Sequence, residues 1–217
     1  MTNNIDPDNR DFLRSLLAGN RGECSKIIHD HLNNQLSVTD VYEKVIRNSL
    51  YEIGELWELN KISVASEHLA SAIVESILNE LYLTIMHNDK SNKKVVVACV
   101  ENEFHQIGIK MVSDVFEING WNSFFLGANT PTIELISFVE FIKPYMLAIS
   151  LSIYSNIPIL EKMIQKIRDD MPELPILVGG QAFQRGGQDV IANYPNVVYL
   201  PDLNSIDTFI QKFQQNG

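Results

Sequence analysis

The chain has 217 residues, 45% of them hydrophobic and 20% charged, so it can form one large domain or two small ones with a real core. Its 27 acidic residues outnumber 17 basic ones, and the net charge of −10 argues against binding nucleic acid or anionic membranes through a basic surface. Two cysteines, Cys24 and Cys99, are too few for a disulfide framework or a cysteine-rich zinc site. The polar start MTNNIDPDNRD shows no signal peptide, and no run approaches the roughly 18 apolar residues of a membrane span. We therefore expect a soluble cytoplasmic protein.

Residues 1–88 are predicted to form a bundle of four or five amphipathic helices. Hydrophobic residues recur there at helical spacing, and the longest series runs from Leu69 to Ile85. Polar breaks separate the series, the last of them around 60–61, and Ser63 follows it in a position to cap the final helix. Short loops between such helices are typical of a small bundle.

The polar segment HNDKSNKK at 87–94 is interpreted as a linker, which divides the chain into a helical cap at 1–88 and an α/β domain at 89–217. After the linker, hydrophobic runs of strand type alternate with helical patterns, which predicts a five-stranded, doubly wound parallel sheet. The strands are expected at 95–100, 123–126, 146–152, 176–178 and 197–200, and the helices at 108–119, 132–142, 159–170, 188–193 and 206–213.

Ligands of such sheets bind beyond the carboxyl ends of the strands, so the loop after the first strand is a candidate site. It contains Glu103, His105 and Gly108. A histidine there can give one ring nitrogen to a metal while a carboxylate two residues earlier binds the other. A polar histidine in a solvated loop is the alternative. No second His or Cys lies nearby to complete a zinc shell, so a metal at His105 would bring its own equatorial ligands, as in a macrocycle.

Two further features lie at the ends of later strands. Gly179 and Gly180 end the fourth strand, where they either make room for a bulky ligand group or form a tight turn. Ser150 and Ser152 occupy alternate positions of the predicted third strand, so their hydroxyls would share a face and line a cavity, or else bind a neighbouring loop.

In order and spacing, these motifs resemble the cobalamin-binding domain over residues 94–214. The matching segments are E-x-H-x-x-G at 103–108, LGANTP at 126–131, Ser150, the Gly pair at 179–180, and Leu-Pro-Asp at 200–202. The family has Asp where this chain has Glu103, and Leu where it has Ser152. The first departure lengthens the carboxylate's reach, so we expect it to hold His105 less firmly.

The resemblance implies a flavodoxin-like domain in which His105 is the lower axial ligand of the cobalt. It further implies that the displaced nucleotide tail lies in a slot lined by small residues, and that the rest of the loop and one tyrosine also contact the cofactor. The slot residues are Gly108, Ser150, Ser152, Gly179 and Gly180, and the further contacts are Glu103, Phe104, Gln106, Ile107 and Tyr154.

Within the helical part, Trp57 precedes the run NKISVASEH at 60–68. By periodicity alone, Trp57 is more readily a core aromatic and the Glu67–His68 pair a solvated helix start. The same pattern resembles the helical cap of adenosylcobalamin photoreceptors of the CarH type. That resemblance implies that Trp57 packs on the adenosyl group, that Glu67 binds its ribose, and that His68 lies near the upper face of the corrin.

Two departures from those light-dependent repressors affect the expected output. They carry an N-terminal DNA-binding domain, whereas this sequence begins with the cap, so direct regulation of DNA is not expected. They also have a His after the Trp, which captures cobalt after photolysis, where this chain has Glu58.

The chain also resembles the photocobilins, which add a biliverdin-type bilin to the cobalamin. Aromatic residues that could wall a bilin cleft are interpreted as core instead. They are Phe104, Phe124, Phe125, Tyr154 and Phe183.

The leading hypothesis is a light sensor rather than an enzyme, acting through a homodimer or higher oligomer and an unknown protein partner. The alternative is the corrinoid carrier subunit of a methyltransferase system, which would share the whole second domain. A third reading, a flavodoxin-like module for another cofactor, has only the fold in its favour.

Overall fold

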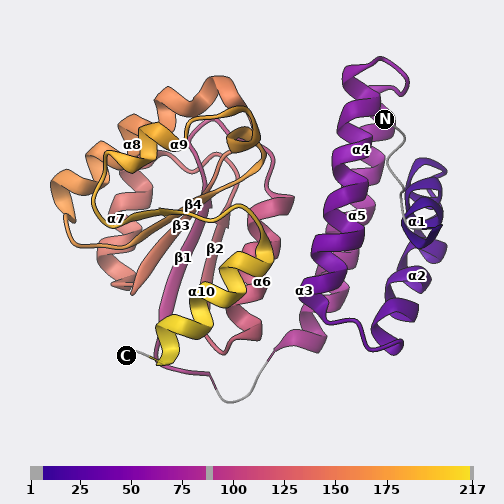
Figure 1. Cartoon of the computed structure of the whole chain (residues 1–217), viewed down its shortest axis with the longest axis horizontal. Helices are drawn as coiled ribbons and strands as arrows, with labels where there is room; N and C mark the ends of the chain where they lie inside the picture. Colours follow the sequence, from indigo (N-terminus) through magenta and orange to yellow (C-terminus); the bar gives the residue numbers. More distant parts are fainter. Residues whose placement is uncertain (1–6, 87–89, 216–217) are drawn as a thin grey trace. The chain divides into compact units, whose positions relative to one another are not determined.

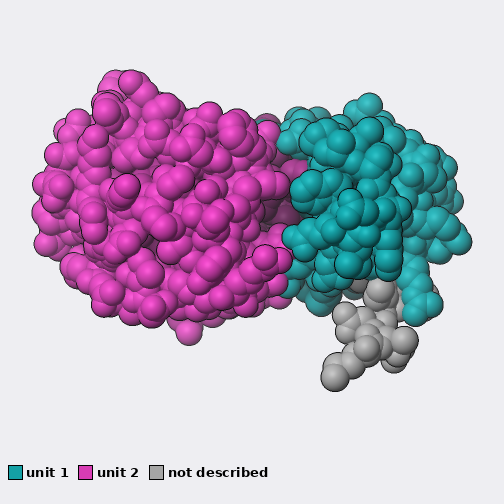
Figure 2. Space-filling view, turned by 90° about the horizontal axis from the view of Figure 1, so that it is seen from above, with its two compact units in different colours: residues 1–84 teal, residues 85–217 magenta. Residues whose placement is uncertain are grey.

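The computed structural model describes residues 7–86 and 90–215. The chain divides into two compact units, Met1–Thr84 and Ile85–Gly217, coloured separately in Figure 2. Positions 1–6 of the polar start and 87–89 of the predicted linker lie outside the described residues. Among the described helices, none has the length and hydrophobicity needed to cross a membrane.

The first unit is helical, as predicted (Figure 1). The helix that begins at Val64 is capped as expected, because the Ser63 hydroxyl accepts a hydrogen bond from the Ser66 amide at 3.1 Å. The core lies where the hydrophobic faces meet, with Phe12, Ile28 and Ile53 almost completely buried. The elements are α1 (Pro7–Leu17), α2 (Arg21–Asn33), α3 (Val38–Val41), the π-helical turn η1 (Tyr42–Ile46), α4 (Arg47–Glu58) and α5 (Val64–Ile85).

The second unit is the predicted five-stranded parallel sheet, with strand order β2-β1-β3-β4-β5. Its strands are β1 (Lys94–Cys99), β2 (Asn122–Gly127), β3 (Met146–Ser150), β4 (Ile176–Gly179) and β5 (Val197–Tyr199). Its helices are α6 (Ile107–Ile118), α7 (Thr132–Ile142), α8 (Ile157–Asp170), α9 (Gln188–Ala192) and α10 (Leu203–Gln215), with 3₁₀ turns η2 (Tyr154–Asn156) and η3 (Gln181–Arg185).

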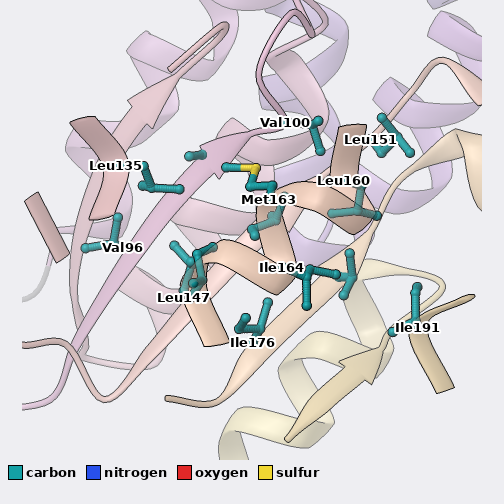
Figure 3. Close-up of a cluster of buried hydrophobic side chains, with 14 of the residues drawn as sticks. Val96, Val100, Leu135, Leu147, Leu151, Leu160, Met163, Ile164, Ile176 and Ile191 are labelled. Atoms are coloured by element: carbon teal, nitrogen blue, oxygen red, sulfur yellow. The ribbon is translucent and has the colours of Figure 1, made fainter. Parts of the chain in front are cut away.

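Helices cover both faces of this sheet (Figure 1). Alternate strand residues such as Val96 and Leu147 pack against Leu135 of α7 and Leu160 of α8, which forms the core shown in Figure 3. The opposite face is covered by α6, against which α10 packs. Because both faces are buried, the central strands are continuous hydrophobic runs rather than alternating ones.

Some element ends differ from the predicted ones. The third strand stops at Ser150 instead of continuing to residue 152, which places Ser152 in the following loop. The last helix begins at Leu203 rather than 206, because the Asp202 carboxylate accepts the Ser205 amide at 2.7 Å and caps the earlier start.

Candidate functional site

The site lies at the carboxyl end of the sheet, between β1 and β3. The chain leaves β1 for its neighbour β2 on one side and later returns through β3 on the other, so the strand order reverses at this point. Open parallel sheets bind their ligands at such a reversal, because the loops diverge there and leave a crevice. The loop after β1, residues 100–106, runs across it and carries the predicted ligand His105.

Glu103 holds the imidazole of His105 in a defined orientation. Its Oε1 atom lies 2.5 Å from His105 Nδ1 and also accepts the His105 backbone amide at 3.1 Å. The hydrogen bond at Nδ1 leaves Nε2 as the ring nitrogen suited to a metal. The predicted carboxylate–histidine pair is thus confirmed. The imidazole itself is 61% exposed, whereas the Glu103 side chain is completely buried.

Glu103 is itself firmly held, although the sequence led us to expect a looser hold on His105. Its second oxygen, Oε2, accepts the backbone amides of Ser152 at 2.9 Å and Ile153 at 3.0 Å. One carboxylate thereby contacts both His105 and the loop after β3. Burial alone would raise the pKa of Glu103, but the hydrogen bonds from the His105 ring and from the three backbone amides outweigh it and lower the pKa to about 2.

The same loop is tied to the loop after β2 through Asn102 and Asn129, neither of which was predicted as a site residue. The Asn102 amide donates to Asn129 Oδ1 at 2.9 Å, and the Asn129 amide donates to the Glu103 carbonyl at 2.8 Å. Both asparagines adopt the left-handed conformation that Asn tolerates better than most residues. Glu101 Oε2 accepts the Thr132 hydroxyl at 2.7 Å. Asn129 belongs to the LGANTP motif, so that motif was the sequence signal for the contact between the two loops.

The glycines of the site differ in what an added side chain would meet. A Cβ on Gly180, whose φ is +115°, would lie 2.2 Å from the Leu151 carbonyl oxygen, and one on Gly179 would lie 2.9 Å from that of Leu200. Gly179 and Gly180 therefore let neighbouring backbone segments approach closely. This favours the tight-turn interpretation over a space for a bulky ligand group. A Cβ on Gly108 would have no atom within 4 Å, so the fold leaves room there for a ligand.

Ser150 and Ser152 do not act as the predicted pair on one strand face. Ser150 is buried at the end of β3, opposite Cys99 of β1, whereas Ser152 follows the strand and gives its backbone amide to Glu103. The prediction was wrong because β3 ends two residues earlier than its hydrophobic run.

The aromatic residues near the loops divide into two groups, which corrects their interpretation as core. Phe183 is buried, and Phe124 packs edge-on against Phe138 with ring centroids 6.2 Å apart. Phe104 is instead 68% exposed beside His105, Tyr154 is 45% exposed, and Phe125 is also exposed. Gln106 and Ile107, at the start of α6, are partly buried, and Gln106 Oε1 accepts the Ala128 amide at 3.3 Å.

The predicted cap residues Trp57, Glu67 and His68 belong to the first unit. Trp57, at the end of α4, is 47% exposed, so its interpretation as a core aromatic is wrong. Glu67, in the first turn of α5, accepts the Ser71 hydroxyl at 2.8 Å through one oxygen and lies 2.8 Å from His68 Nδ1 through the other. The His68 side chain is exposed.

The chemistry of this donor set fits a cobalt corrinoid. Among the described residues, no three His, Cys, Asp or Glu side chains gather as a metal-binding group. A corrinoid brings its own equatorial nitrogens and asks the protein for one ring nitrogen, which His105 offers. The oriented imidazole of His105 would bind such a group, the open space at Gly108 would admit it, and the exposed Phe104 would pack against it. The individual contacts stay predictions.

Comparisons with known proteins point to the B12 binding domain. One model of the B12 binding domain matches residues 93–201 and a second matches residues 9–82. Of curated relatives, the HTH-type transcriptional repressor CarH of Myxococcus xanthus is 25% identical over 182 residues, and CarA of the same organism is 26% identical over 123. These alignments cover 81% and 55% of this chain, but only 60% and 41% of the relatives' own lengths.

A solved structure shows the same fold. The monomethylamine corrinoid protein of Methanosarcina barkeri superposes with a TM-score of 0.77 at 11% identity, covering 93% of this chain and 96% of that one. The matched family model, the CarH homology and the oriented His105 lead to one conclusion. The chain belongs to the B12 binding domain family, and cobalamin is its cofactor.

Proposed function

We propose that this protein is a light sensor that binds adenosylcobalamin with His105 as the lower ligand of the cobalt. The observation that carries the proposal is the segment from Trp57 to His68, which follows the cap pattern of the CarH-type photoreceptors. The alignment with the CarH repressor supports it, since it covers 81% of this chain.

Two side chains of the first unit support the proposal, because their chemistry suits an adenosyl group. Trp57 offers an exposed aromatic surface on which an adenine ring can stack. Glu67 is a partly buried acceptor, oriented by Ser71 and His68, which suits the hydroxyls of a ribose. When bound, adenosylcobalamin supplies a cobalt–carbon bond that light breaks.

Loss of the adenosyl group would remove the partner of Trp57 and let the cap change its position. A change of that kind is a two-state element suited to signalling. We expect its output to be altered self-association, with a homodimer in at least one state, or altered binding of a protein partner.

A corrinoid carrier for methyl transfer is the alternative function. The monomethylamine corrinoid protein has the same fold, so the architecture suits a carrier as well as a sensor. The Trp57 and Glu67 arrangement favours the sensor, because a methyl group gives neither side chain a partner of matching size.

The discriminating experiment uses the full chain reconstituted in the dark with adenosylcobalamin or with methylcobalamin. Absorption spectra and size-exclusion profiles are recorded before and after a pulse of green light. The sensor is supported if adenosylcobalamin is retained and light changes both the spectrum and the elution volume. Retention of methylcobalamin alone, with no light-dependent change in assembly, would select the carrier.

A matched pair of variants isolates the cap. Trp57→Ala should lose retention of adenosylcobalamin, whereas Leu83→Ala, which truncates another exposed apolar side chain of the same unit, should keep it. Equal losses in both variants would contradict a specific role for Trp57.

A bilin as second chromophore stays a prediction from the resemblance to photocobilins. It is tested by adding biliverdin to the cobalamin-loaded chain and looking for a red-shifted bilin band that co-elutes with the protein.

A further inference from the structure

An open groove of about 590 Å³ lies at the amino ends of β3 and β4, the end of the sheet opposite His105. Its walls come from the last turn of α7 and from the connections that lead into β3 and β4. Tyr145, Met171 and Leu174 contribute apolar surface there, and Tyr145 is 51% exposed.

The backbone that forms this groove is held in place. Arg168 donates to the carbonyls of Met171, Leu174 and Asn196, at 3.1, 2.6 and 3.1 Å, and so fixes the connection into β4. Lys143 ends α7 in the left-handed conformation, with its amide bonded to the Val139 carbonyl. A surface that is already ordered loses little conformational entropy when a partner binds.

Beside the groove, the outer face of α7 exposes large apolar side chains. Ile133 is 61% exposed and Phe141 is 81% exposed, eight residues apart on the helix. Residues 133, 137 and 141 share one helical face, with Ser137 between the two apolar side chains. Phe141 directly follows Glu140, which lines the groove, and this exposed face and the groove are together called the α7 surface. Exposed apolar groups gathered in this way mark interaction sites.

Charge defines the chemistry of the partner. Three exposed carboxylates, Glu140, Asp170 and Glu173, line the groove, against the single cation Lys143. We propose that the α7 surface docks a cationic amphipathic segment of another protein, whose apolar side chains cover Phe141 and enter the groove while its Lys or Arg side chains meet these carboxylates. A second copy of this chain is the poorer occupant of this surface, since in a two-fold dimer the same carboxylates would face each other.

The first turn of α7 is also bonded to the cofactor loop. Glu101 Oε2 accepts the Thr132 hydroxyl and, at 3.3 Å, the Thr132 amide. The docking surface and His105 are therefore connected through one helix. The α7 surface is distinct from the cobalamin site, and docking there does not require that light be the signal.

The test measures fluorescence anisotropy of a labelled synthetic peptide, helical and amphipathic, with Leu and Phe on one face and Lys on the other. The cobalamin-loaded full chain should bind this peptide but not its Lys→Glu counterpart. The double variant Glu140→Lys/Glu173→Lys should bind about tenfold more weakly, and so should Phe141→Ala. Asp30→Lys, an exposed reversal on α2 of the other unit, is the matched control and should bind as the wild type does.

Three results would overturn the inference: no binding of the cationic peptide, equal weakening by Asp30→Lys and by the groove variants, or self-association that Phe141→Ala abolishes without any peptide binding. The last result would assign the surface to a second copy. Circular dichroism and retained cobalamin identify variants that fold. Peptide binding is measured both in the dark and after illumination. If light changes nothing, the peptide binding still tests the docking surface, and the missing light response counts only against the proposed sensor.

Discussion

Glu103 Oε1 lies 2.5 Å from His105 Nδ1, while Oε2 of the same carboxylate binds two amides of the loop after β3. One buried side chain thus connects the predicted cobalt ligand to Ser152, which lies 49 residues after Glu103 in the sequence. The orientation of His105 is a property of the packed sheet end, and not only of its own loop. Buried carboxylates with several donors of this kind are costly to disturb.

Replacement of Glu103 by Ala should therefore damage both stability and cofactor binding. The three amides and the ring nitrogen lose their acceptor, so we expect the free energy of unfolding to fall by roughly 2–4 kcal/mol. Cobalamin should bind roughly 10–100-fold more weakly, as is usual when the partner of a metal-binding histidine is removed. Denaturant unfolding and cobalamin titration measure the two effects. Glu134→Ala, which removes an exposed carboxylate of the same unit, should change little, and comparable losses there would contradict the assignment.

Glu103 also predicts how stability depends on pH. Its pKa is about 2 in the folded chain against an ordinary value of 4.5. Because the pKa is lower in the folded chain, the ionised Glu103 carboxylate stabilises the fold at pH values above its ordinary pKa. This contribution is lost as the pH falls from about 4.5 toward 2. The difference in unfolding free energy between the wild type and Glu103→Gln should shrink over that interval. Urea titrations at a series of pH values test this, and a difference that stays constant would refute it.

Two glycines should respond oppositely to alanine. Gly180→Ala forces a Cβ against the Leu151 carbonyl at a φ of +115°, so the apoprotein should lose stability. Gly108→Ala meets no protein atom and lies in the first turn of α6, so the apoprotein should be unchanged or more stable by up to about 1 kcal/mol. Cobalamin binding should nevertheless weaken in Gly108→Ala. Thermal unfolding without cofactor, followed by titration, separates the two. Full affinity in Gly108→Ala would show that the cofactor does not use this space.

Glu101 should hold the start of α7. Its removal in Glu101→Ala frees the Thr132 amide and hydroxyl, which resembles the loss of a helix cap and should cost about 1 kcal/mol. Hydrogen exchange should become faster in the first turn of α7 while its last turn stays protected. Thr132→Val, which keeps the amide contact and loses the hydroxyl, should show a smaller change. Uniform exchange along the helix would contradict a local role.

Local patterns were sufficient for the kind and order of the elements. The helix predicted at 132–142 has those bounds in the structure, and the Ser63 cap is where the sequence places it. Side-chain periodicity and capping act over a few residues, so they can be read along the chain. The motif around His105 likewise belongs to one short loop, and with the later segments in the same order it carried the resemblance from which cobalamin was predicted.

Contacts between distant segments were decided only by the tertiary structure. The periodicity of the sequence does not predict that a backbone amide of the loop after β3 donates to Glu103. Nor does it predict that Phe104 is exposed while Phe183 is buried. The hydrophobic run of β3 continues past Ser150, but the strand ends where its neighbours end. Sequence by itself determined the elements, the family and the predicted ligand, because these depend on local chemistry. The anchoring of that ligand and the surface of α7 depend on which loops and helices meet in space, and only the folded chain decides this.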